Sequence, residues 1–111
     1  MSASAPSPGT LVITSAVENG TASIALAGEL DLSGARQLEA RLDEAEREGT
    51  ARLVIDLRAL SFIDSTGLRL LLQADARARE RGCELVLRPG EPGVQRVFEV
   101  TGALDVLRFE D

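Results

Sequence analysis

Histidine, lysine, tyrosine and tryptophan are absent from this 111-residue sequence, and cysteine occurs once. Without histidine there is no Ser-His-Asp triad and no imidazole ligand for a metal. Without lysine there is no Walker-A lysine, no Schiff base and no Ser-Lys dyad. The single cysteine, Cys83, excludes an intramolecular disulfide and a cysteine-based zinc site. We therefore expect a protein that is not an enzyme, has no catalytic residue, and binds neither a cofactor nor a metal.

The charge and the apolar pattern exclude further classes. The net charge of -6 argues against binding to a nucleic acid backbone. No apolar run approaches the roughly 20 residues that span a bilayer. The segment Met1–Gly9 has neither the basic part nor the apolar part of a signal peptide. We expect a cytoplasmic protein without membrane or direct nucleic acid contact, in which residues 1–9 form a disordered arm and residues 10–111 form one domain.

Four segments have the pattern of β-strands. Residues 11–17 are rich in β-branched side chains, and Asn19-Gly20 after them is the strongest short signal for a hairpin turn. Apolar residues alternate with small or polar ones over residues 22–26, which predicts a strand that is better buried on one face. The runs 53–57 and 84–88 follow. The first of these has no alternation, which is typical of a central strand covered on both faces.

Three helices are predicted beside these strands. Apolar residues recur every three or four positions from Ala35 to Glu48, with Ser33 as the candidate N-cap. A second helix is predicted from near Ser65 to about Arg81, and a short third helix around residues 94–101. The order β-β-α-β-α-β-α predicts an α/β fold with a mixed, mostly parallel β-sheet of about four to five strands and helices packed on it.

The segment Phe62-Ile63-Asp64-Ser65-Thr66-Gly67 places a serine between the central strand and the second helix. Ser65 could be a nucleophile, a phosphate acceptor or a helix cap, and Asp64 and Thr66 are equally candidates for the cap. The surrounding residues do not form a Gly-x-Ser-x-Gly nucleophile elbow, and no base is available, which excludes the first use. A cap and a phosphate acceptor use the same helix end, because its partial charge of about +0.5 accommodates the charge of about -1.5 to -2 on a phosphate. Such a phosphate would act on a docked partner rather than on the fold.

The run from Leu53 to Leu68 resembles the signature of STAS domains, in particular bacterial anti-sigma-factor antagonists. The segment Gly28-Glu29-Leu30-Asp31 is similar to a second landmark of that family, at the end of a strand. The resemblance covers about residues 10 to 109. It implies a single STAS-like domain that works as a partner switch rather than as an enzyme.

In that family the unphosphorylated antagonist binds an anti-sigma factor and so frees a sigma factor for transcription. The anti-sigma factor is commonly also a Ser/Thr kinase, whose phosphorylation of the motif serine breaks the complex, and a Ser/Thr phosphatase resets it. The resemblance implies that Ser65 is the phosphorylation site. It also implies a set of partner-binding residues, with the last three at the exposed start of a docking helix: Asp31, Asp64, Ser65, Thr66, Gly67 and Leu68.

Alternative roles stay open for several of these residues. Asp31 is either a partner contact or a cap of the turn before the first helix. Asp56 is expected to bond loop N–H groups, with a partner contact as the alternative. Phe62 is expected in the core, with an exposed anchor for a partner as the alternative. An alternative function is a STAS subunit of a transport or signalling assembly that has no phosphorylation cycle.

Overall fold

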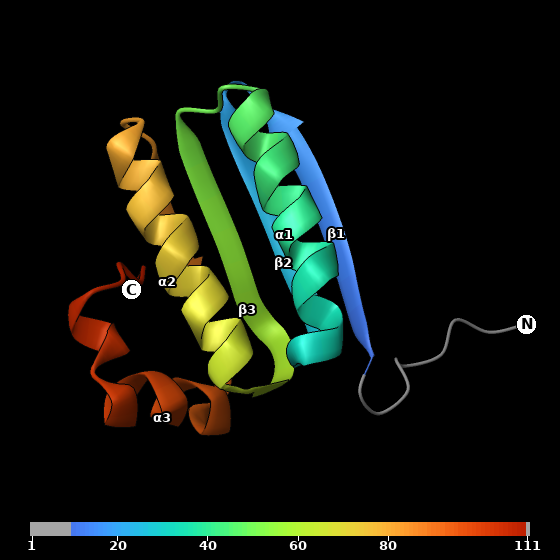
Figure 1. Ribbon diagram of the computed structural model, residues 1–111, viewed down its shortest axis with the longest axis vertical. Coiled ribbons are helices and arrows are strands. Elements are labelled where there is room, and N and C mark those ends of the chain that lie inside the picture. The colour runs from blue at the N-terminus through green and yellow to red at the C-terminus, as the bar shows by residue number, and fades with distance from the viewer. Residues whose placement is uncertain (1–9, 111) are drawn as a thin grey trace, which may run out of the picture.

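The computed structural model describes residues 10–110, in which four strands form one mixed sheet with helices packed against it (Figure 1). The predicted order and the α/β class are confirmed, with four strands and a short 3-10 helix after the last α-helix. The predicted disordered arm at residues 1–9 lies outside the described residues. The elements are β1 (Leu11–Glu18), β2 (Thr21–Leu30), α1 (Leu32–Arg47), β3 (Arg52–Ile63), α2 (Ser65–Glu80), β4 (Glu84–Arg88), α3 (Pro92–Thr101) and η1 (Ala103–Asp105).

The strands lie in the order β1-β2-β3-β4 across the sheet. β1 is antiparallel to β2, whereas β2, β3 and β4 are parallel neighbours. Asn19 and Gly20 have φ angles of 52° and 79°, the left-handed values that a tight hairpin turn requires. The predicted hairpin is therefore confirmed. Parallel neighbours need a long crossover connection, which α1 provides between β2 and β3 and α2 provides between β3 and β4.

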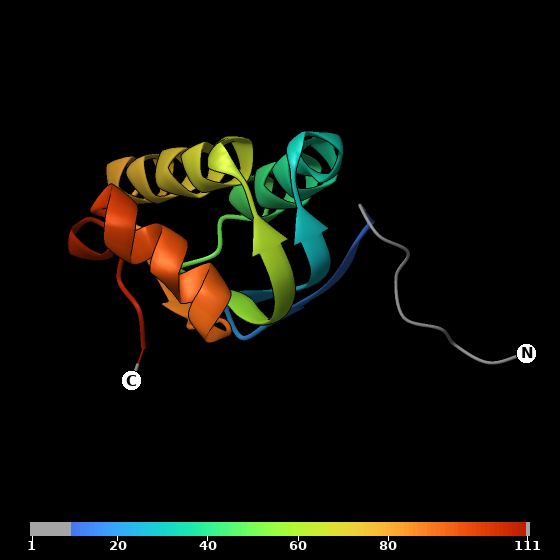
Figure 2. The same cartoon turned by 90° about the horizontal axis from the view of Figure 1, so that it is seen from below.

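The core lies between the sheet and two helices. α1 and α2 lie side by side on one face of the sheet, as Figure 2 shows from below. α3 packs against β3, and the Phe98 ring meets the Phe109 ring edge-on, with 5.2 Å between the centroids. Because alternate strand residues point to the same face, apolar side chains from neighbouring strands meet beneath the helices. The largest fully buried side chains are Ile24, Leu26, Leu30, Leu38, Ile55, Leu57, Leu60, Leu71, Leu87 and Phe98.

β2 and β3 are longer than the predicted strands, which covered residues 22–26 and 53–57. β3 continues to Ile63, whereas β4 ends at Arg88, opposite Asp56. The last part of β3 therefore pairs with β2 alone. Phe62 points away from its buried neighbour Ile63, since successive strand residues face opposite sides. Phe62 is 47% exposed, so the prediction that it lies in the core is wrong.

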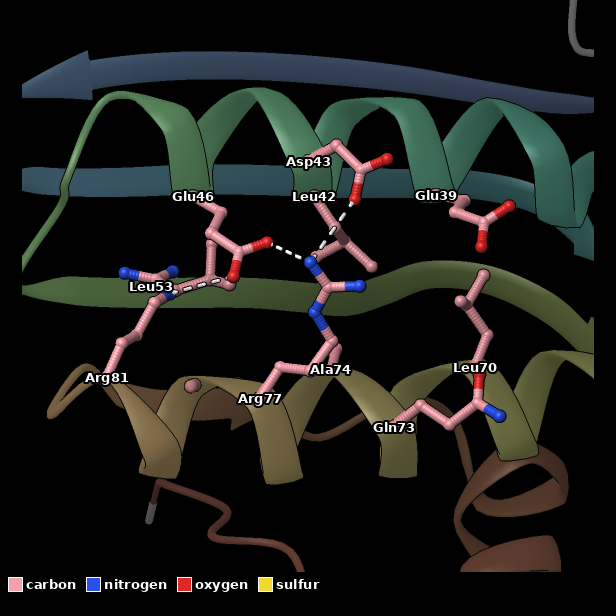
Figure 3. A pocket seen from close by; sticks show the side chains of 11 residues that line it. Glu39, Leu42, Asp43, Glu46, Leu53, Leu70, Gln73, Ala74, Arg77 and Arg81 are labelled. Carbon is pink, nitrogen blue, oxygen red and sulfur yellow. Dashed lines mark hydrogen bonds and ion pairs between the residues drawn. The ribbon is translucent and has the colours of Figure 1, made fainter.

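A group of charged side chains joins α1 to α2 near their C-terminal ends (Figure 3). Arg77 of α2 forms ion pairs with Glu46 and with Asp43 of α1, the latter with 4.0 Å between the charged atoms. Arg81 lies 3.9 Å from Glu46 and donates a hydrogen bond of 3.1 Å to the carbonyl of Thr50. Exposed pairs of this kind contribute only about 0 to 1 kcal/mol each. They connect the two helices at the end opposite the N-terminal ends of α1 and α2.

Candidate functional site

The candidate site lies where β2 and β3 end and α1 and α2 begin. Because the two strands are parallel neighbours, their carboxyl ends reach the same edge of the sheet, with Leu30 paired to Ile63. The backbone N–H of Asp64 donates a hydrogen bond of 3.2 Å to the carbonyl of Leu30. The two landmarks that the sequence separates by 33 positions, Asp31 and Asp64, thus follow directly from two hydrogen-bonded strands.

Asp64 caps α2. Its backbone is extended, with φ -106° and ψ -176°, and its Oδ1 accepts a hydrogen bond of 2.9 Å from the N–H of Gly67. Ser65 is the first residue of the helix, so of the three candidate caps Asp64, Ser65 and Thr66, the structure selects Asp64 and excludes Ser65. The reason is that a cap residue must be non-helical, and Asp64 already has that conformation. The Ser65 side chain is exposed and makes no hydrogen bond to any residue within the range 10–110, so its hydroxyl is available for modification.

Replacing the Asp64 cap should destabilise the domain. Asp64→Ala should lower the free energy of unfolding by about 1 kcal/mol, because the Gly67 N–H loses its acceptor. Asp64→Asn is the control, since asparagine caps about as well as aspartate and should stay close to wild type. Urea titration followed by circular dichroism measures both variants. Equal stability of the alanine variant and the wild type would contradict the assignment of this cap.

Asp31 caps α1 in the same way. Its Oδ1 accepts hydrogen bonds from the N–H groups of Ser33 and Gly34, at 3.0 and 3.1 Å, and from the Ser33 hydroxyl at 2.8 Å. Ser33, the predicted N-cap, is instead inside the helix and helps to hold the cap, so that prediction is wrong. The hydroxyl of Ser33 and the N–H of Gly34 lower the pKa of Asp31, which keeps a negative charge at this edge of the sheet. Contact of Asp31 with a partner stays a prediction.

The three residues that follow Ser65 on α2 are more buried than the sequence predicted. Thr66 is half-buried, while Gly67 is buried and Leu68 is only 8% exposed. A Cβ atom on Gly67 would lie 2.6 Å from Cγ and 2.9 Å from the carbonyl oxygen of Leu30. The predicted exposure of Gly67 and Leu68 is therefore wrong, because the first turn of α2 packs against Leu30 at the end of β2. Gly67 and Leu68 pack against the core and hold the helix turn that carries Ser65, and they do not form part of the exposed surface.

Asp56 lies on β3, away from this edge of the sheet. Its carboxylate pairs with the Arg58 guanidinium at 2.8 Å and accepts a hydrogen bond of 3.0 Å from the Arg58 backbone N–H. The hydrogen bond from the Arg58 side chain lowers the pKa of Asp56, and the bond from the Arg58 backbone N–H lowers it to a smaller extent. The predicted structural role of Asp56, as an acceptor from a backbone N–H, is confirmed.

Several residues near the site are not singled out by any sequence pattern. Leu32, the first residue of α1, is 72% exposed, although its hydrophobicity alone favours burial. Arg36 and Arg69 lie on the facing sides of α1 and α2 and border one hollow together with Leu32. Only the packing of the two helices decides this arrangement. Asp75, farther along α2 and away from the site, is buried and pairs with Arg79 at 2.9 Å, and the spacing of four residues between opposite charges is a sequence signal for this pair.

Two further kinds of site have no counterpart among the residues described. No group of three or more His, Cys, Asp or Glu side chains in residues 10–110 is placed to hold a metal ion. None of the helices in the same range combines the length and apolar content required to cross a membrane. What remains is an exposed hydroxyl on a helix N-terminus beside two capping carboxylates.

Comparison with known families gives one match along most of the chain. A family model described as Mlab, STAS domain matches residues 13–108. Among curated proteins, the chain is 40% identical over 81 residues to the putative anti-sigma factor antagonist BtrV of Bordetella bronchiseptica, covering 73% of this chain and 70% of BtrV. It is 34% identical over 88 residues to the anti-sigma-B factor antagonist of Listeria monocytogenes, covering 79% of this chain and 77% of that protein.

A solved structure shares the same fold. The crystal structure of an anti-sigma factor antagonist from Mycobacterium paratuberculosis superposes with a TM-score of 0.80 at 26% sequence identity. The superposition covers 94% of this chain and 88% of the other. The order of two strands followed by strand-helix units is therefore shared with a protein of that description.

Proposed function

Because this chain belongs to the STAS domain family, we propose that it is an anti-sigma-factor antagonist of the cytoplasm, which binds an anti-sigma factor and thereby releases a sigma factor. Two curated relatives that carry such a name support the proposal, each matched over more than two thirds of both chains. The single observation that carries it is Ser65, whose exposed side chain has no hydrogen-bond partner in residues 10–110 and stands at the N-terminus of α2.

In this proposal the anti-sigma factor is a Ser/Thr kinase, and phosphorylation of Ser65 ends the complex. A phosphate of charge about -1.5 to -2 is tolerated by the free domain, because the positive end of α2 offsets part of it. The partner has no such compensation, and its contacts over Ser65 are lost through repulsion and steric overlap. A Ser/Thr phosphatase then restores the binding form.

The structure supports different roles for the six predicted partner-binding residues. Asp31 and Asp64 are acidic caps on neighbouring helices, and in this proposal both carboxylates contact the partner. Ser65 and Thr66 offer hydroxyl groups on the first turn of α2. Gly67 and Leu68 act indirectly, since they are buried and hold this turn against the sheet. No step of the proposal requires this chain to catalyse a reaction.

Phosphorylation tests the proposal. Incubation with a Ser/Thr kinase anti-sigma factor of the source organism and ATP should add one phosphate per chain, measured by intact mass. Ser65→Ala should take up none. Ser23→Ala is the control, because it removes an exposed hydroxyl on β2, outside the predicted partner-binding residues, and should be labelled like the wild type.

Full labelling of Ser65→Ala would refute the site. If no such kinase labels or binds the wild type, the alternative function gains support, namely a STAS subunit of a transport or signalling assembly without a phosphorylation cycle. In that case the chain should be found in a stable complex with the assembly whatever the state of Ser65.

A further inference from the structure

The N-terminal halves of α1 and α2 border an open hollow next to Ser65. The hollow has a volume of about 180 Å³. A single water needs only about 10 to 15 Å³ of such space, so the hollow can receive a side chain. Its walls include Leu32, Ala35, Arg36 and Glu39 of α1, and Thr66 and Arg69 of α2. Because Thr66 directly follows Ser65, the hollow is continuous with the surface around the proposed phosphorylation site.

Leu32 makes one rim of this hollow apolar. It is 72% exposed, more than any other large apolar side chain in residues 10–110. Leu32 is the first residue of α1 and borders the hollow together with Thr66 of α2. An exposed leucine beside a hollow is a suitable anchor for another protein, because its burial on binding removes apolar surface from water.

Arg36 and Arg69 make the hollow positively charged. Within residues 10–110, seven of the twelve arginine side chains form ion pairs, and Arg41 donates a hydrogen bond to Ser15. Neither Arg36 nor Arg69 has an ion pair or hydrogen bond with any side chain in residues 10–110. Glu39 is the acidic residue of the lining, which leaves two positive side chains against one negative in a chain of net charge -6. The lining therefore favours carboxylates on the partner.

The spacing of Arg69 links the hollow to Ser65. Arg69 follows Ser65 by four residues on α2, and side chains four apart on a helix are neighbours. A phosphate on Ser65 would bring a charge of about -1.5 to -2 next to Arg69. The positive surplus of the hollow would then be cancelled by the same modification that ends the complex.

We infer that this hollow is the docking surface for a segment of the anti-sigma factor that carries an apolar side chain flanked by carboxylates. The inference rests on the proposed function and extends the contact surface from Ser65 to Leu32, Arg36 and Arg69. The apolar side chain packs against Leu32, and the carboxylates pair with the two arginines. Phosphorylation of Ser65 then weakens the complex by occupying Arg69 as well as by repulsion.

Binding of point variants tests the inference. The dissociation constant is measured for an anti-sigma factor that binds the unmodified wild-type chain. Leu32→Ala and Arg69→Glu should each weaken binding by about tenfold or more, as expected for residues at the centre of an interface. The effect of Arg69→Glu should shrink as salt is raised, because salt screens exposed charges.

Two variants elsewhere on the surface serve as controls. Val100→Ala on α3 removes an apolar side chain that is 70% exposed, and Arg96→Glu on α3 reverses an exposed arginine that lacks an ion pair in residues 10–110. Both should bind within about twofold of wild type. If the wild type binds while Leu32→Ala and Arg69→Glu match these controls, the hollow is not the docking surface and the proposed function stands. If the wild type binds no anti-sigma factor, the proposed function and this inference both fail.

Discussion

Ser65→Asp should weaken binding to the anti-sigma factor by about 100-fold or more, which corresponds to about 2.7 kcal/mol. The substitution places a permanent negative charge on an exposed side chain at the first position of α2. The charge follows the capping carboxylate of Asp64 directly along the chain and meets the partner where carboxylates are expected. A full switch from bound to free requires about 5.5 kcal/mol of differential binding, and a phosphate carries more charge than aspartate. True phosphorylation should therefore have the larger effect.

The fold itself should be unaffected by Ser65→Asp. A negative charge at the N-terminus of a helix is favourable by about 0.3 to 1 kcal/mol, so the free energy of unfolding should stay the same or rise slightly. Ser65→Ala should keep the stability of the wild type, because the Ser65 hydroxyl makes no hydrogen bond to residues 10–110, and it should lose far less affinity than Ser65→Asp because it adds no charge. Ala76→Asp adds the same charge to an exposed position later on α2 and should bind normally.

Isothermal titration calorimetry against the anti-sigma factor measures all three variants. The switch would be refuted by a Ser65→Asp variant that binds as tightly as the wild type. An equal loss of affinity in Ala76→Asp would instead point to a general effect of charge on this helix.

Gly67→Ala should lower the free energy of unfolding by about 1 to 3 kcal/mol, the range typical of overpacking in a well-packed core. The new Cβ would lie 2.6 Å from Cγ of Leu30 and 2.9 Å from its carbonyl oxygen. That carbonyl accepts the hydrogen bond from the N–H of Asp64, so the clash pushes apart the two strand ends that carry the site. Alanine gains about 0.5 to 1 kcal/mol over glycine within a helix, which offsets only part of this loss.

Gly93→Ala provides the matched control. Gly93 also lies in the first turn of a helix, α3, and a Cβ added there meets no atom within 4 Å. Its substitution should raise the free energy of unfolding by about 0.4 to 1 kcal/mol. Thermal and urea unfolding of both variants give the comparison. If Gly67→Ala proved as stable as Gly93→Ala, the close contact between α2 and Leu30 would be ruled out as a constraint.

These two predictions concern opposite sides of the same helix turn. Ser65 faces outward, and its substitution should change binding without changing stability. Gly67 faces β2, and its substitution should change stability first and binding only as a consequence. Measuring stability and affinity on the same variants therefore separates the surface of the site from its support.

Local patterns predicted the elements of the fold but misplaced several of their ends. The hairpin at Asn19-Gly20 and the order of helices and strands were predictable because turns and periodicity depend on near neighbours. The caps were not, since Ser33 and Ser65 are as good candidates in sequence as Asp31 and Asp64. Which residue becomes the cap depends on where β2 and β3 stop pairing, and that is a tertiary property.

The sequence by itself determined that Ser65 stands at a strand-to-helix junction and that this chain lacks the histidine and lysine of common catalytic sites. It also determined the family, through residues that are close together along the chain. Only the tertiary structure decided that Gly67 and Leu68 are buried, that Phe62 is exposed, and that Leu32, Arg36 and Arg69 meet beside Ser65. The physical reason is that burial and charge pairing depend on neighbours from α1 and α2, which the chain brings together only when both helices pack on the same face of the sheet.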